Sequence, residues 1–195
     1  YAWLQHILWK LKKTGQAGVV LANGSLSSED KIRKNMIDKD VVDAIVALPG
    51  SLFVNTPIPV CLWFLTNDKK KNGRDRSKQV LFVDARNLGS MEKRTIRTLN
   101  FEDIKKISET INLWKTGKNY SNIPGFCKDV NFDEIKKNDY SLLPGRYVGL
   151  DKNIIKKTNS NLSIDELKNK YFKLVNEANE IDKKINKTLE TIKLK

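Results

Sequence analysis

Apolar and polar residues fall into blocks over the first half of the chain, and these blocks predict an α/β fold. Apolar residues recur at helical spacing in residues 2–13, which predicts an amphipathic helix. The run Gly18–Ala22 predicts a buried strand, and residues 27–37 predict a second helix with a serine at its N-cap. The run Val41–Leu48 predicts another strand. Because these strand runs are continuous rather than alternating, we expect a sheet that is covered on both faces.

The stretch Ala47–Thr66 holds the most distinctive loop of the chain. Two apolar runs flank a short segment that presents Phe53 and Asn55 between small and proline residues. Pro57 and Pro59 restrict the backbone, so we expect a stiff loop. Two strands joined by a loop with a protruding aromatic side chain are a reasonable shape for a site at a sheet edge.

The segments after this loop predict an antiparallel hairpin. The apolar runs Val60–Leu65 and Val80–Val83 are joined by Asn67–Lys78, a polar segment that contains one glycine. A turn of this kind favours pairing between the two runs. We therefore expect an antiparallel hairpin at the end of an otherwise parallel sheet.

Helical patterns dominate the remainder of the chain. A stripe at Ile104, Ile107, Ile111 and Trp114 predicts a helix over 102–115, with Asn100 as its N-cap. A short helix is expected after Asn131. Residues 161–195 form a capping box at Ser163–Glu166 followed by a coiled-coil-like stripe. This stripe needs a partner helix, and we favour one from another subunit over one from this chain. Its predicted interface residues are Leu167, Tyr171, Leu174, Ile181 and Ile185.

Composition and charge add little that is specific. The net charge of +13 fits either nucleic-acid binding or solubility alone, because lysine far outnumbers arginine and is scattered. The two cysteines and the one histidine have no zinc-type spacing, so no metal site is predicted. Two cysteines favour a reducing compartment, and we expect a cytoplasmic protein. No apolar run approaches the roughly 20 residues of a membrane helix.

The residue patterns show no catalytic constellation. The chain has no glycine-rich phosphate loop, no serine nucleophile elbow and no H-E-x-x-H. His6 is expected at the surface rather than as a base. Asp84 ends a strand, where catalytic carboxylates occur, but a carboxylate that caps a turn is the commoner case. Spacing alone indicates a basic α/β protein and no more.

Three stretches carry a resemblance to a known family. They are Y-A-W-L-Q-H-I-L with G-V-V-L-A-N-G-S-L-S (1–28), L-P-G-S-L-F-V-N-T-P-I-P-V-C-L-W-F-L (48–65) and V-L-F-V-D-A-R-N-L-G (80–89). Together they closely resemble the modification (M) subunit of type I restriction–modification systems, an S-adenosylmethionine-dependent adenine-N6 DNA methyltransferase. The segments P-G-F-C-K (124–128) and N-D-Y-S-L-L-P-G-R-Y-V-G (138–149) are similar to the same family.

The resemblance implies a Rossmann-like methyltransferase sheet of which this chain is the second half. A glycine-bearing cofactor loop and an Asn-Pro-Pro-Phe motif are expected upstream of Tyr1, and the chain contains no Asn-Pro-Pro. The same resemblance implies that the chain divides into three parts. They are 1–90 for the methyltransferase half, 91–160 for an extension of short helices and loops, and 161–195 for a long helix. We therefore expect no catalytic residue in this chain, and no activity or cofactor binding from this chain alone.

The resemblance also assigns roles to residues of this chain. Phe53 matches the aromatic residue that packs on a flipped adenine, and Asn55 and Pro57 shape the same loop. The alternative is that Phe53 only fills the core beneath the loop. Lys93, Arg94 and Arg97 are candidate phosphate contacts. The lysines and arginines between Lys69 and Arg76 are further candidates for phosphate contacts. The alternative, that these charged side chains are simply exposed to solvent, is at least as plausible.

The implied partners are DNA, a specificity subunit, a second M subunit and a restriction subunit. The long C-terminal helix would suit docking to the specificity subunit or to the second M subunit. An alternative function is a non-catalytic DNA-binding or assembly module that keeps the methyltransferase-like fold.

Overall fold

The computed structural model describes residues 1–27, 31–71, 73–150 and 164–191. The chain divides into two compact units, Tyr1–Lys152 and Asn153–Lys195. The three-part division expected from the sequence stays a prediction.

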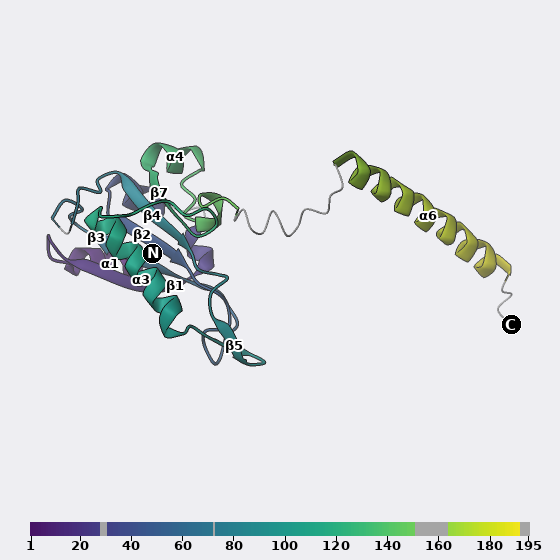
Figure 1. Cartoon of the computed structure of the whole chain (residues 1–195), viewed down its shortest axis with the longest axis horizontal. Coiled ribbons are helices and arrows are strands. Elements are labelled where there is room, and N and C mark those ends of the chain that lie inside the picture. Colours follow the sequence, from purple (N-terminus) through teal and green to yellow (C-terminus); the bar gives the residue numbers. More distant parts are fainter. Residues whose placement is uncertain (28–30, 72, 151–163, 192–195) are drawn as a thin grey trace. The chain divides into compact units, whose positions relative to one another are not determined.

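A mixed five-stranded sheet forms the centre of the first unit (Figure 1), in the order β1-β3-β2-β4-β7. Strands β2 and β4 are parallel, and the other neighbouring pairs are antiparallel. It follows that β1, β2 and β4 all run in the same direction. The strands are β1 (Gln16–Ala22), β2 (Val42–Ala47), β3 (Val60–Thr66), β4 (Gln79–Asp84) and β7 (Cys127–Asn131).

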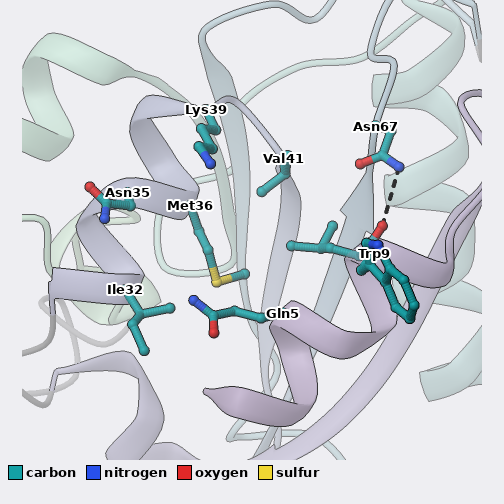
Figure 2. A pocket seen from close by; sticks show the side chains of 9 residues that line it. Gln5, Trp9, Ile32, Asn35, Met36, Lys39, Val41 and Asn67 are labelled. Atoms are coloured by element: carbon teal, nitrogen blue, oxygen red, sulfur yellow. Dashed lines mark hydrogen bonds between the residues drawn. The ribbon is translucent and has the colours of Figure 1, made fainter.

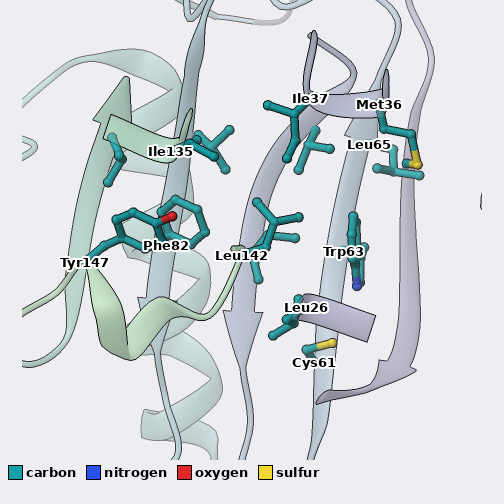
Figure 3. Close-up of a cluster of buried hydrophobic side chains, with 14 of the residues drawn as sticks. Leu26, Met36, Ile37, Cys61, Trp63, Leu65, Phe82, Ile135, Leu142 and Tyr147 are labelled. Carbon is teal, nitrogen blue, oxygen red and sulfur yellow. The ribbon is translucent and has the colours of Figure 1, made fainter. Parts of the chain in front are cut away.

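Apolar side chains cover the sheet on both faces, as the sequence predicted. Along β2, Ile45 points into one apolar cluster while Ala44 and Val46 point into the other. The first cluster packs under α1 (Ala2–Lys10), α2 (Lys31–Asp38) and α4 (Phe132–Lys137), and the second under α3 (Phe101–Thr116). Figure 3 shows the first cluster, where the rings of Phe82 and Tyr147 stack with centroids 4.3 Å apart.

Local signals placed several helices correctly. The Asn100 side chain accepts a hydrogen bond from the Asp103 backbone N–H, and Asp103 reciprocates in a capping box at the start of α3. Asn131 caps α4 in the same way by accepting from the Glu134 backbone N–H. Met36 and Ile37 of α2 are buried, as their spacing predicted. These helices are therefore specified by residues close together in the sequence.

The predicted hairpin between Val60–Leu65 and Val80–Val83 is wrong, because β2 lies between β3 and β4. The observed hairpin is β2–β3, joined by the loop 48–59. The polar connection before β4 is held beside the start of β2 by Lys69 and Arg76, which bond to Asp40 and Asp43. The chain thereby passes from β3 across β2 before β4 begins.

The prediction of a buried first strand is also wrong. Strand β1 lies at an edge of the sheet and alternates between exposed and half-buried residues, with Val20 51 % exposed. Strand β7, at the opposite edge, and the small hairpin of β5 (Ser90–Lys93) and β6 (Ile96–Thr98) were not predicted. Two 3-10 turns, η1 (Asn23–Leu26) and η2 (Pro144–Arg146), complete the described part of this unit.

The second unit contains α6 (Ile164–Thr191), which confirms the long C-terminal helix. Ser163 of the predicted capping box lies outside the described residues. Among the described residues no helix combines the length and the hydropathy needed to cross a membrane.

Candidate functional site

Three strands that run in the same direction end at one edge of the sheet, which we call the carboxyl edge. Strand β1 ends at Ala22, β2 at Ala47 and β4 at Asp84. The segments that leave these ends are η1, the loop 48–59 and the connection to the β5–β6 hairpin. Ligands of α/β proteins bind outside the carboxyl ends of such strands. The carboxyl edge is therefore the first place to look for a site.

The loop 48–59 is closed by hydrogen bonds across its base. The Leu48 N–H donates to the Val60 carbonyl at 2.9 Å, and the Ser51 N–H donates to the Pro57 carbonyl at 3.2 Å. A Cβ at Gly50 would lie 2.6 Å from the Pro57 carbonyl oxygen, so only glycine fits this close approach. This geometry agrees with the stiff loop expected from its prolines.

The tip of this loop presents apolar side chains to solvent. Phe53 is 46 % exposed and belongs to neither apolar cluster, while Val54 is 79 % exposed. The Thr56 N–H donates to the Phe53 carbonyl at 3.4 Å, which closes a turn around the tip. Asn55 and Pro57 are exposed on the same loop. This placement disfavours the alternative that Phe53 only fills the core.

The β5–β6 hairpin is attached to the loop through Arg97. The Arg97 N–H donates to the Ser51 carbonyl at 2.8 Å. Its guanidinium donates to the carbonyls of Leu88 at 3.1 Å and Gly89 at 3.3 Å. The structure thus brings the predicted phosphate cluster beside the predicted base-binding loop, although Arg97 is half-buried and its guanidinium is engaged by the backbone.

Lys93 and Arg94 lie at the turn of this hairpin. Both are exposed, and neither side chain has a hydrogen bond or ion pair to another described residue. Their roles as phosphate contacts stay a prediction.

Two of the basic residues between Lys69 and Arg76 have a structural role instead. Lys69 is 4 % exposed, and its Nζ donates to Asp40 at 2.6 Å. Burial lowers the pKa of the Lys69 ammonium, and the bond to Asp40 opposes that shift. Arg76 is fully buried, and its Nε donates to Asp43 at 3.1 Å. For Lys69 and Arg76, the prediction of phosphate contacts and the alternative of solvent-exposed charges are therefore both wrong.

A pocket of about 240 Å³ opens at the carboxyl edge, and sequence reasoning did not predict it. Asp84 caps the turn after β4 by accepting from the Arg86 N–H at 3.2 Å. The same carboxylate accepts from Arg86 Nε at 2.8 Å and from Nη2 at 2.6 Å, which raises the pKa of that guanidinium. The position of Arg86 two residues after a strand end was the available signal. The lining residues are Asn23, Ala47, Arg86, Leu143, Pro144, Gly145 and Arg146.

A second pocket, of about 370 Å³, lies between α1 and α2 (Figure 2). Trp9 and Met36 line it, together with Val41 and Asn67. Val41 precedes β2 and Asn67 follows β3, so this pocket lies toward the edge opposite the carboxyl edge. Its lining is mostly apolar and offers no acid–base pair.

The described residues contain no group of side chains arranged to hold a metal ion. Cys61 and Cys127 are free and buried, and burial raises the pKa of both thiols. His6 is exposed and contacts the ring of Trp9, which confirms its surface position.

In the second unit, the predicted interface residues are exposed along α6. Leu167 is 46 %, Tyr171 63 % and Leu174 55 % exposed, and Ile181 and Ile185 are 56 % and 49 % exposed. Whether another subunit covers this stripe stays a prediction.

Comparison with known proteins places these observations in a family. A family model described as N-6 DNA methylase matches residues 1–156. The chain belongs to this family. The match runs from α1 beyond the η2 turn, so this N-6 DNA methylase chain carries family sequence through the whole described part of its first unit.

Relatives of this N-6 DNA methylase chain confirm the resemblance to type I M subunits. It is 47 % identical over 153 residues to the type I restriction enzyme HindI methylase subunit of Haemophilus influenzae, covering 76 % of this chain and 33 % of that protein. It is 31 % identical over 196 residues to the MpnII methylase subunit of Mycoplasma pneumoniae, covering 99 % of this chain and 33 % of that protein. The chain thus spans about a third of the length of these relatives.

Solved structures agree on the fold of the N-6 DNA methylase chain. A type I restriction–modification methyltransferase subunit from Streptococcus thermophilus superposes with a TM-score of 0.66 at 28 % identity, covering 75 % of this chain and 30 % of that one. The EcoKI M protein superposes with a TM-score of 0.58 at 18 % identity, covering 73 % of this chain and 36 % of that one, and supports the fold alone.

Proposed function

We propose that this chain is part of a type I restriction–modification methyltransferase that transfers a methyl group from S-adenosylmethionine to the N6 nitrogen of adenine in DNA. The observation that carries this proposal is the match of residues 1–156 to the N-6 DNA methylase family. The identity to named methylase subunits supports it. The chain's own contribution is to the binding of the target base and the DNA strand.

The loop 48–59 forms one wall of the adenine pocket. A base inside a duplex is inaccessible, so an enzyme that modifies it takes it out of the stack and holds it partly by aromatic contact. Phe53 is half-exposed at the tip of a loop that is braced at its base, so the ring is available for such a contact. Asn55 and Pro57 fix the shape of the loop beside it. Stacking of a base on an aromatic ring contributes about 1–3 kcal/mol.

The pocket at the carboxyl edge does not suit the sulfonium group of S-adenosylmethionine. The cofactor carries a positively charged sulfonium, whereas the pocket at the carboxyl edge is lined by the guanidinium groups of Arg86 and Arg146. The chain also lacks the glycine-bearing loop and the Asn-Pro-Pro-Phe motif that the family implies. We propose that upstream parts of the full subunit bind the cofactor and activate the adenine.

The rest of a Rossmann-like sheet would join this chain at β1. This strand is the sheet edge, and its alternating half-exposed residues leave Val20 51 % exposed. A strand from the upstream half, paired with β1, would cover that edge and extend the row of strand ends at the carboxyl edge. The five-strand sheet described here would then be the second half of the methyltransferase sheet, with the mainly helical segment as its extension.

The basic hairpin turn and α6 would contact the partners. Lys93 and Arg94 are exposed next to the loop and would neutralise DNA phosphates, whereas base recognition would belong to the specificity subunit. The apolar stripe of α6 would dock on a helix of the specificity subunit or of a second M subunit, and a restriction subunit would complete the larger complex. We propose a cytoplasmic location, which a DNA substrate inside the cell supports.

The test uses the full-length subunit that contains this chain, assembled with its specificity subunit. We expect N6-methyladenine to form in cognate duplex when S-adenosylmethionine is supplied. Duplex binding without any methylation would contradict the proposal and favour the non-catalytic DNA-binding or assembly module.

A further inference from the structure

Two arginines meet at the pocket of the carboxyl edge, next to the loop 48–59. We propose that this pocket, built around Arg86 and Arg146, binds a phosphate group of the DNA strand next to the target adenine. The proposal rests on the proposed function, because it concerns the same DNA strand, and it assigns a phosphate site separate from Lys93 and Arg94.

Arg86 is held in place before any ligand arrives. Asp84 accepts two hydrogen bonds from the Arg86 side chain, at 2.8 and 2.6 Å, and its own side chain is only 10 % exposed. The Arg86 side chain is 53 % exposed, and its Nη1 has no partner among the described residues. A preorganised guanidinium with a free edge suits an oxyanion, because little side-chain freedom is lost on binding.

Gly145 brings the η2 turn close to this ion pair. A Cβ at this position would lie 2.8 Å from Arg86 Nη2 and 3.5 Å from Asp84 Oδ2. The next residue, Arg146, is exposed, and in the described ranges its guanidinium has no hydrogen bond or ion pair. Since Asp84 offsets only one of the two guanidinium charges, the pocket keeps a positive charge that favours an anion.

A third and more polar pocket, of about 420 Å³, adjoins the pocket of Arg86 and Arg146. Arg146 lines both pockets. Arg33 and Lys34 also line this third pocket, and Asp139 is the acidic residue among its lining side chains. Arg33 is itself buried, at 2 % exposed, but Lys34 and Arg146 together outweigh the single carboxylate of Asp139, so this third pocket also keeps a positive charge.

The pocket is connected to both ends of the loop 48–59. Ala47 lines the pocket and is the residue from which the loop departs. Asn23, another lining residue, donates from its N–H to the carbonyl of Pro59 at 3.2 Å, at the loop's other end. Because a flipped base remains attached to its own phosphates, an anion site this close to the base-binding loop suits a phosphate of the same strand better than a distant ligand.

Asn23 also leaves an unmet acceptor in this region. Its Oδ1 is buried and has no hydrogen-bond partner among the described residues. Buried polar atoms of this kind are normally satisfied by a ligand or by ordered water.

The experiment combines protein and DNA changes in the full-length subunit bound to its specificity subunit. The methylated adenine is located first, and the phosphates flanking it are then replaced one at a time by uncharged methylphosphonates. In the unaltered complex, we expect one replacement to weaken duplex binding about tenfold, the loss typical of one charge-assisted hydrogen-bond contact. In the Arg146→Ala complex, where Arg86 alone contacts the phosphate, that same replacement should cost clearly less than tenfold.

Lys118→Glu is the matched control for Arg146→Glu, because both changes alter the charge equally. Lys118 is exposed just after α3, whose last turn reaches the start of β1 through a 2.9 Å bond from Lys115 Nζ to Gln16, away from the carboxyl edge. We expect Arg146→Glu to weaken duplex binding far more than Lys118→Glu. An Arg146→Ala complex that loses as much affinity as the unaltered complex at every methylphosphonate would overturn the proposal. Failure of the proposed function would appear separately, as absence of methylation by the unaltered complex.

Discussion

Truncation of Phe53 separates its proposed role at the target base from a role in the core. Phe53 is 46 % exposed and lies outside both apolar clusters. Full burial of such a side chain contributes about 1.5–3 kcal/mol, so a half-buried ring contributes about 1 kcal/mol to folding. Loss of base stacking should cost about 1–3 kcal/mol, or roughly 5- to 150-fold in kcat/KM. We therefore expect Phe53→Ala to reduce methylation strongly and thermal stability slightly.

The assay measures methyl transfer to cognate duplex and thermal unfolding for each variant of the full subunit with its specificity partner. Phe53→Tyr keeps an aromatic face and should retain most of the activity. Phe101→Ala, which removes a ring that is 78 % exposed at the start of α3, should change neither property. Phe82→Ala removes a fully buried ring and should cost about 3–5 kcal/mol of stability.

Two results would refute this reasoning. A Phe53→Ala subunit as destabilised as Phe82→Ala would show that the ring supports the core. A Phe53→Ala subunit that methylates DNA at the unaltered rate would show that the ring does not touch the base.

Four further predictions concern the rest of the molecule. Arg76→Ala should lower the unfolding free energy by about 3 kcal/mol, because the buried carboxylate of Asp43 then keeps only Lys115, 3.7 Å away, as an ionic partner. Lys105→Ala in an exposed ion pair should lower it by less than about 0.5 kcal/mol in the same denaturant titration. Cys61 and Cys127 have pKa values raised by burial, so at pH 8 a thiol reagent should label the native protein slowly and the unfolded protein fast; equal rates would contradict this. Calorimetry should detect no binding of S-adenosylmethionine to this chain alone, and tight binding would show that the cofactor site lies within it. Leu174→Glu, at a 55 % exposed position on α6, should reduce co-purification with the specificity subunit or between M subunits without changing helix content, and unchanged assembly would remove α6 from the interface.

Part of the site could be predicted from sequence because its signals are local. The loop around Phe53 is defined by flanking strands, prolines and a glycine that lie within a short stretch. Its proposed role came from the resemblance and not from spacing. The pocket of Arg86 and Arg146 had only one local signal, the position of Arg86 after a strand end, because the other lining residues come from distant parts of the sequence.

The sequence by itself determined the elements whose signals are short-range. The capping box at Asn100 and the six consecutive buried residues of β2 each depend on neighbours within a few positions. These signals specify a helix or a strand before any distant contact forms.

Only the tertiary structure decided which strands are neighbours. A polar connection such as 67–78 can join two adjacent strands in a hairpin or carry the chain across a third strand. The sequence of the connection does not distinguish these two topologies. Here β2 pairs with both β3 and β4, and the buried pairs of Lys69 and Arg76 hold the connection across its start. Because of the same strand order, β1 lies at an edge of the sheet. The side chains of Lys69 and Arg76, which lie in a polar segment of the sequence, are buried. Strand order and the burial of charge depend on contacts between distant segments, which local periodicity does not encode.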